Sequence, residues 1–390
     1  MKIDKVLIVG GGIGGLTFGL TLRRVGIPFE IFERAPELKE VGAGVGLWAN
    51  AVRVLDRLGV AGEIRALGQP LKWGEIANWK GRVLSRTDIS ENLEKRDAAC
   101  YVVHRAELHA ALARQLPGET IKTDHECTGF EADGGRVIVH FKNGATAEGT
   151  LVVGADGLNS MIRRQLWDDG RPRYSDQTCF RAVVETDYAD TDVLREVQGA
   201  GRRFGLCPLG KGRLYWFAAL NAAEGRMIPF ADRPRFLTGR YAGWAYRIPE
   251  LIAATAPEKI IQNDLVDRVP LEKWSAGRAT LLGDAAHPTT PNFGQGACMA
   301  IEDALVLTRA LVENDRLSAA FEAYEAARRP RTSAIVNDSW KFGRLARWEN
   351  PLAVGLRETL VRLTPDSVTA KMLRRQIDYD AGPLPAAVRQ

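Results

Sequence analysis

The sequence predicts an α/β protein in which an antiparallel sheet is inserted into a parallel one and a helical C-terminal segment follows. Short apolar runs at 6–9, 151–153 and 279–282 are each followed by glycine. Such runs are typical of buried parallel strands that lead into a turn and a helix. Residues 178–220 alternate as sheet strands do, and from Ala320 onward the pattern is helical and rich in arginine.

The first apolar run leads into the pattern G-x-G-x-x-G, formed by Gly10, Gly12 and Gly15. Gly10 permits a tight turn, Gly12 lets a pyrophosphate approach the backbone, and Gly15 lets the helix pack closely on the strand. A second strand at 29–32 ends in Glu33, about 20 residues further on, where a carboxylate binds the ribose of an adenine dinucleotide. This combination predicts a Rossmann-like dinucleotide site, with FAD and NAD as alternatives.

Composition is that of a globular enzyme. The chain has 390 residues, 45% hydrophobic content and a net charge of +5 with acids and bases interleaved, so we expect no nucleic-acid partner. The five cysteines are widely spaced without a C-x-x-C pair, which predicts neither a disulfide framework nor a metal site. No apolar run reaches the roughly 18 residues of a membrane span. We therefore expect a cytoplasmic enzyme.

The next stretch mixes turns, strands and helices. Residues 41–48 form a second glycine-rich loop before a helix at 50–58; they are either an irregular turn or backbone that lies against a flat ring or a ribose. Residues 71–89 predict a hairpin of sheet strands, and 101–105 a strand that leads into a helix. Asp133-Gly134-Gly135 is a hairpin signal between two further strands.

Two more glycine–acid motifs follow. Gly154-Ala155-Asp156-Gly157 lies between an apolar strand and a helix that carries Arg163. Gly283-Asp284 ends a later strand, and Gly294-Gln295-Gly296 opens a helix that is expected to reach Leu311. The exposed amides at that helix start are suited to an anion or a carbonyl group.

Together and in this order, the three motifs resemble the single-component (group A) FAD-dependent aromatic hydroxylases, which include p-hydroxybenzoate hydroxylase, urate hydroxylase and zeaxanthin epoxidase. The likeness covers residues 3 to about 330 and is weakest at 171–270. It implies a p-hydroxybenzoate hydroxylase-type fold with one non-covalent FAD, and with NAD(P)H as a transient co-substrate. In this family reduced FAD and O2 form a C4a-hydroperoxide that hydroxylates or epoxidises a small aromatic substrate.

The resemblance also implies a domain division. The FAD-binding domain would comprise 1–70, 100–170 and 270–330, and the substrate-binding sheet domain 71–99 and 171–269. Residues 331–390 would be a C-terminal helical segment.

The FAD contacts implied by the resemblance fall into three groups. The glycine turn would hold the pyrophosphate, the end of the second strand the adenosine, and the third motif the ribityl chain and the flavin ring. A flavin that gains negative charge on reduction needs donors at its pyrimidine edge, which helix-start amides supply. The expected residues are Gly10, Gly12, Gly14, Gly15, Glu33, Arg34, Gly44, Arg105, Cys127 (by its backbone), Asp156, Gly157, Asp284, Pro291, Gly294, Gln295, Gly296, Ala297 and Cys298.

Two of these residues have an alternative role that does not involve the cofactor. Asp284 would otherwise cap a turn, and Arg105 would otherwise pair with Glu107.

On the substrate side the best candidates are Arg203 and Tyr215, on neighbouring predicted strands, whose local patterns resemble positions used by urate hydroxylases. Arg203 would bind an anionic substrate and Tyr215 a phenol or ketone; the alternative is a solvated charge and a packing aromatic. Urate-type enzymes tend to carry an acid where this chain has Asn292, which resembles the epoxidase branch. His287 is either a general base or structural.

Rival functions stay open at this point. The same FAD domain would serve a non-oxygenating reductase or halogenase, or a nucleotide sensor without turnover. The substrate, the choice of NADH or NADPH, and the choice of monomer or homodimer are also open.

Overall fold

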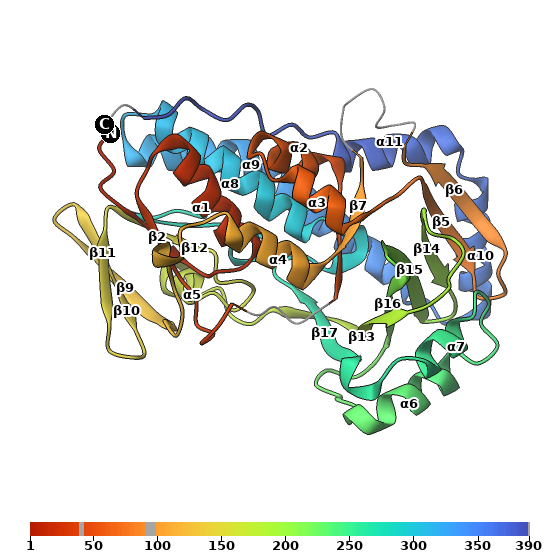
Figure 1. The fold of residues 1–390 in the computed structure, drawn as a ribbon. Helices are drawn as coiled ribbons and strands as arrows, with labels where there is room; N and C mark the ends of the chain where they lie inside the picture. The colour runs from red at the N-terminus through yellow and green to blue at the C-terminus, as the bar shows by residue number, and fades with distance from the viewer. Residues whose placement is uncertain (39–42, 91–98, 389–390) are drawn as a thin grey trace.

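The computed structural model describes residues 1–38, 43–90 and 99–388 (Figure 1). Its first layer is a five-stranded sheet of order β18-β12-β1-β2-β8, in which every pair is parallel. All of β1 is buried, as expected for a strand covered on both faces. The strands are β1 (Val6–Val9), β2 (Phe29–Phe32), β8 (Ile121–Lys122), β12 (Leu151–Gly154) and β18 (Ala279–Leu281).

Helices cover one face of this sheet, and a small sheet covers the other. On the first face, α1 (Ile13–Val25) packs on α8 (Gly296–Glu313). The predicted hairpin at 133–135 joins two strands of a three-stranded sheet, whose third strand sequence analysis missed. The elements on the second face are α5 (Met161–Trp167), β9 (Cys127–Asp133), β10 (Arg136–Phe141) and β11 (Thr146–Gly149).

The second glycine-rich segment differs from its prediction as a loop. Residues Gly44–Leu47 form strand β3, which pairs antiparallel with β7 (Tyr101–His104). Val41 and Gly42, which begin the predicted loop, lie outside the described residues. The remaining elements here are α2 (Ala49–Arg57), α3 (Ala61–Leu67), β4 (Gln69–Pro70) and α4 (Arg105–Arg114).

The inserted layer is a seven-stranded sheet of order β17-β13-β16-β15-β14-β5-β6. The prediction of a purely antiparallel sheet is wrong at one pair, because β14 runs parallel to β5. Sequence analysis also missed β14 and β17. The strands are β5 (Trp73–Asn78), β6 (Val83–Asp88), β13 (Arg173–Glu185), β14 (Val193–Gln198), β15 (Arg202–Gly210), β16 (Arg213–Asn221) and β17 (Ile261–Asp267).

One face of the inserted sheet has its own hydrophobic core, which includes Phe180, Phe204 and Trp216 and residues of α6 (Arg233–Arg240) and α7 (Ile248–Ala253). The other face points toward the five-stranded sheet, since Cys207 and Leu209 belong to the core of that layer. The inserted sheet therefore packs with one face on α6 and α7 and with the other face on the layer that contains the five-stranded sheet.

Three helices end the chain: α9 (Leu317–Ala346), α10 (Pro351–Leu363) and α11 (Asp366–Ile377). The 30-residue α9 packs along α8 and continues through residue 330, so secondary structure does not break at the predicted boundary there. The domain division itself stays a prediction. Among the described residues, every helix is too short or too polar to span a bilayer.

Candidate active site

The glycine turn after β1 has the geometry that its spacing predicts. Gly10 has φ +113°, and a Cβ there would lie 2.3 Å from the Ala155 oxygen. A Cβ at Gly15 would lie 2.0 Å from the Gly10 oxygen, so both positions exclude a side chain. Gly14 is tight as well, with Leu282 Cδ2 at 2.8 Å from such an atom. By contrast, the space in front of Gly12 is open, with no atom within 4 Å.

The steric difference between Gly15 and Gly12 predicts separate effects of substitution on folding and on cofactor binding. We expect Gly15→Ala to disrupt the strand–helix packing and to yield little folded protein. Gly12→Ala should fold as well as wild type, because its Cβ meets nothing, yet it should bind a dinucleotide less tightly because the methyl group fills the space for a pyrophosphate. Thermal unfolding and equilibrium dialysis with FAD measure the two effects. Unchanged FAD affinity in Gly12→Ala would contradict this placement.

At the end of β2, the Glu33 carboxylate accepts backbone hydrogen bonds from Gly11 and Ala35, each at 2.9 Å. These bonds fix both oxygens at the mouth of the glycine turn and leave further lone pairs for a ribose. Arg34 is exposed beside it. The Cys127 thiol points to the Gly129 oxygen at 3.7 Å, so only its backbone is available to a ligand, as expected.

Asp156 has a structural task in addition to its predicted one. Its Oδ2 accepts from the Met161 amide at 2.7 Å at the start of α5, whereas Oδ1 is buried without a hydrogen-bond partner among the described residues. Burial raises the pKa of the Asp156 carboxyl. The adjacent Gly157 adopts φ +79° and faces open space.

Asp284 lies on a tight turn directly after β18 and near the start of α8. Its side chain is exposed, yet the enclosing protein raises the pKa of its carboxyl by desolvation, against the lowering effects of His287 and Arg105. Solvent therefore reaches this carboxylate although protein surrounds it, and we refer to this position as the recess. Within the described residues no hydrogen bond engages this carboxylate, so it does not act as the turn cap that we considered as the alternative. The two carboxylate oxygens of Glu107 accept hydrogen bonds from Arg213, whereas the alternative considered above was a pair with Arg105.

The start of α8 presents polar groups that are suited to bind a ligand. Gln295 Oε1 accepts from Asn50 at 3.0 Å, whereas its Nε2 is buried without a partner among the described residues. The Cys298 thiol is turned away toward the Gly46 oxygen at 3.5 Å, and burial raises its pKa to about 12. At Gly294, Gly296, Ala297 and Cys298 the backbone groups are thus the ones suited to contact a ligand, with Pro291 exposed beside them.

The inserted sheet turns three rows of side chains toward this recess. One row runs Arg203–Ala219–Cys179, the next Gly205–Phe217–Arg181, and the third Cys207–Tyr215–Val183. The Phe217 ring lies directly over Gly205, since a Cβ at that glycine would fall 1.8 Å from the ring. Phe217, Arg181 and Tyr215 are only partly buried although they lie on central strands, which leaves room above them.

Arg203 is almost fully buried, with 2% of its surface exposed. It donates to Asn292 Oδ1 at 2.7 Å, and Glu196 and Gln177 lie further away at 3.5 Å each. Asn292 in turn bonds Thr290 and Ser339. Asn292 is neutral, and Arg203 Nε has no partner among the described residues. The positive charge of this buried guanidinium is therefore only weakly balanced by negative charge nearby.

Tyr215 lies on the same face as Arg203 but not next to it. The pair that contains Tyr215 lies four residue positions along the strands from the pair that contains Arg203, or about 13 Å away. The ring packs on Gly44, where a Cβ would lie 2.4 Å from it, so β3 and the inserted sheet touch here. Burial raises the pKa of the Tyr215 hydroxyl far above its usual value, which keeps the phenol neutral.

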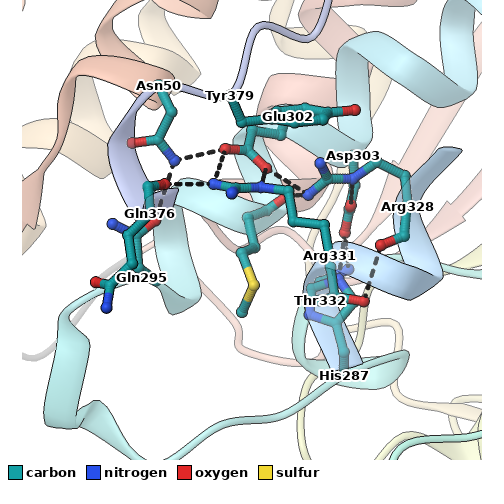
Figure 2. Close-up of polar contacts among 12 residues, drawn as sticks. Asn50, His287, Gln295, Glu302, Asp303, Arg328, Arg331, Thr332, Gln376 and Tyr379 are labelled. Atoms are coloured by element: carbon teal, nitrogen blue, oxygen red, sulfur yellow. Dashed lines mark hydrogen bonds and ion pairs between the residues drawn. The ribbon is translucent and has the colours of Figure 1, made fainter. Parts of the chain in front are cut away.

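His287 belongs to a buried ionic cluster behind the site (Figure 2). Its Nε2 lies 2.5 Å from Asp303, which Arg328 of α9 also contacts at 2.6 Å. Although burial acts to raise it, His287 and Arg328 lower the pKa of Asp303 to about 2. Arg331 binds Glu302, which also contacts Asn50. His287 therefore lies inside an ionic cluster in which residues of α9 hold α8 in place.

Sequence analysis missed two residues of the recess. Arg181 shares the inner face of β13 with Cys179, and strict alternation along that strand would have indicated it. Trp48 has an indole nitrogen 3.1 Å from a Cβ built at Gly294 and without a hydrogen-bond partner among the described residues. Nothing in the local sequence marks that tryptophan as more than a core residue.

With this geometry in place, comparison with known proteins gives the family. The chain belongs to the FAD binding domain family, whose model matches residues 4–339. It is 40% identical over 375 residues to the aurachin C monooxygenase/isomerase of Stigmatella aurantiaca, covering 96% of this chain and 98% of that protein. It is 33% identical to the 2-heptyl-3-hydroxy-4(1H)-quinolone synthase of Pseudomonas aeruginosa, covering 95% and 97%.

A solved structure supports the same family. Klebsiella pneumoniae HpxO complexed with FAD and uric acid matches with a TM-score of 0.91 and 28% identity, covering 98% of each chain. The FAD-dependent urate hydroxylase of that organism is 32% identical, covering 85% of this chain and 88% of that protein. The expected hydroxylase-type fold is confirmed. The chain is an FAD-dependent monooxygenase, and NAD(P)H is the co-substrate typical of its family.

Proposed function

We propose that this enzyme hydroxylates a nitrogen heteroaromatic that carries an acidic hydroxyl or enolisable keto group, with a 4-quinolone as the favoured class. One observation carries the proposal: the buried Arg203 guanidinium bonds the neutral Asn292 at 2.7 Å, whereas its carboxylate partner Glu196 lies at 3.5 Å. Such a buried cation gains most from an anionic ligand. The two relatives that cover nearly the whole chain include a quinolone synthase by name.

The residues at the glycine turn and the start of α8 fit FAD. The open space at Gly12 suits the pyrophosphate, Glu33 the adenosine ribose, and Asp284, as an acceptor, a ribityl hydroxyl. The amides that open α8 and the unpaired Gln295 amide would face the flavin's pyrimidine edge. When bound, FAD takes a hydride from NAD(P)H and activates O2 for transfer of one oxygen atom.

The protein's own contribution is binding, orientation and the exclusion of water. Arg203 stabilises the substrate oxyanion, which makes the ring carbon beside it electron-rich and so reactive toward an electrophilic oxygen. The neutral Tyr215 hydroxyl orients a second polar group, and the Phe217 ring supplies an apolar floor. Overall, substrate, O2, NAD(P)H and a proton give hydroxylated product, NAD(P)+ and water.

Asp284→Ala should fold normally and release FAD more easily. Loss of a charged acceptor to a hydroxyl costs about 1.5–3 kcal/mol, which corresponds to a roughly 10- to 100-fold weaker affinity. Asp284→Asn keeps one acceptor oxygen and should fall between the two. Flavin fluorescence on dilution measures retention. If Asp284→Ala retains FAD as tightly as wild type, the residue does not contact the cofactor.

A substrate panel tests the proposed class. The FAD-loaded enzyme is mixed with NADH or NADPH and with a 2-alkyl-4(1H)-quinolone, urate or 4-hydroxybenzoate, while NAD(P)H oxidation and O2 consumption are followed. The quinolone should stimulate both most strongly, and urate weakly because Asn292 replaces the acid of urate-type enzymes. Stronger stimulation by urate than by the quinolone would contradict the assignment.

A further inference from the structure

Helix α10 turns four leucines away from the protein. Leu352, Leu356, Leu360 and Leu363 are 84%, 55%, 56% and 67% exposed. At 100° per residue, their spacing places all four within a stripe about 80° wide. The exposed leucines are therefore a continuous feature of one helix face and not scattered surface residues.

The opposite face of α10 points inward and carries Arg357 and Glu358 together with the half-buried Val354 and Val361. Arg357 is only 6% exposed, and its guanidinium donates to the Gly199 oxygen at 2.9 Å and to carbonyl oxygens at the end of α9. Glu358 accepts from Asn78 at 3.2 Å on β5. A helix that packs only on its own protein buries its large apolar side chains, whereas the contacts that hold α10 leave its leucines outside.

Helix α11, which follows α10 after two intervening residues, also carries exposed apolar side chains: Val368 and Met372, one turn apart, are 44% and 59% exposed. We call these six apolar residues of α10 and α11 the leucine face. Cations accompany it: Arg362, Lys371 and Arg375 are all exposed on the same two helices, with Asp366 as an exposed acid. Basic charge thus predominates around the apolar residues.

We propose that the leucine face binds the surface of an anionic phospholipid bilayer. Leucines buried at the headgroup boundary with arginine and lysine beside them are the features of an interfacial amphipathic helix. A second copy of the chain fits less well, because its interface would bury the three cations, whereas lipid phosphates pair with them at the headgroup level. The 13-residue α10 is only about 20 Å long, so it lies in the membrane surface and does not cross it.

Vesicle binding by the FAD-loaded enzyme tests the proposal. Wild type should sediment with phosphatidylcholine vesicles that contain phosphatidylglycerol, and less with phosphatidylcholine alone. Leu356→Glu with Leu360→Glu should lower the partition coefficient by more than about tenfold. The matched control, Met227→Glu with Val269→Glu, changes two side chains of similar exposure elsewhere, 55% and 64%, and should bind as wild type does.

Two further measurements complete the test. Arg362→Gln with Lys371→Gln should abolish the preference for the anionic vesicles and the sensitivity to salt. Size-exclusion chromatography with light scattering gives the mass of each variant, and flavin absorbance shows that it is folded. Absence of vesicle binding by wild type overturns the proposal. So does a wild-type dimer that Leu356→Glu with Leu360→Glu converts to a monomer, since the face would then join two copies.

Discussion

An Arg203→Met variant should keep its FAD and lose most of its affinity for an anionic substrate. A charge-assisted bond at a buried site contributes about 1.5–3 kcal/mol, so the substrate Kd should rise roughly 10- to 100-fold. Stopped-flow reduction of the bound flavin by NAD(P)H, with and without substrate, measures both binding and stimulation. Tyr215→Phe, which removes only a hydroxyl, should lose less.

The neighbouring arginine supplies the control for this experiment. Arg202 precedes Arg203 on β15 and points to the opposite face of the sheet, where it bonds the oxygens of Ala200 and Arg240. Arg202→Met removes the same charge from the same strand and should leave stimulation unchanged. If both variants, or neither, lose substrate affinity, Arg203 is not the substrate's counter-ion.

Arg328→Met should destabilise the protein by about 3–5 kcal/mol, because two buried carboxylates then share one cation fewer: Glu302 keeps only Arg331 and Asp303 only His287 among the described residues. Arg328, Glu302 and Asp303 have no exposed side-chain surface, and Arg328 lies 2.5 Å from Glu302 and 2.6 Å from Asp303. Urea unfolding followed by tryptophan fluorescence measures the loss. The cluster holds the start of α8, so the variant should also bind FAD less tightly.

The control for that variant is the next residue of α9. Arg329 is 35% exposed and makes only a 3.7 Å contact with Glu325, one turn earlier. Surface pairs of this kind contribute about 0–1 kcal/mol, so Arg329→Met should shift the unfolding midpoint little. Equal stability of Arg328→Met and wild type would show that the buried cluster is not needed for the fold.

Sequence reasoning succeeded where a local pattern has a steric cause. The turn at Gly10 and Gly15 leaves no room for a side chain, so its spacing could be recognised without the structure. It failed where polar residues are buried by a distant partner. Strand β14 was missed because its Arg195 looks solvated, whereas it pairs across the sheet with Glu75 at 2.7 Å.

The same limit applies to the site. Arg203 and Tyr215 were found from local patterns, and the structure places them on one face, yet their separation depends on strand register, which the sequence does not state. Arg181, by contrast, could have been indicated by strict alternation along β13. The ionic cluster joins residues of α8 and α9 that lie 25 positions or more apart, and nothing in either segment alone indicates the pairing.

The most direct test of the central claim is isotope incorporation from molecular oxygen. The FAD-loaded enzyme is incubated with NAD(P)H, a 4-quinolone and 18O2, and the product is analysed by mass spectrometry together with the NAD(P)H consumed. An FAD-dependent monooxygenase should place one 18O atom in each product molecule for each NAD(P)H oxidised in coupled turnover. Product formed without 18O, or reduction of the substrate without O2 consumption, would contradict the account.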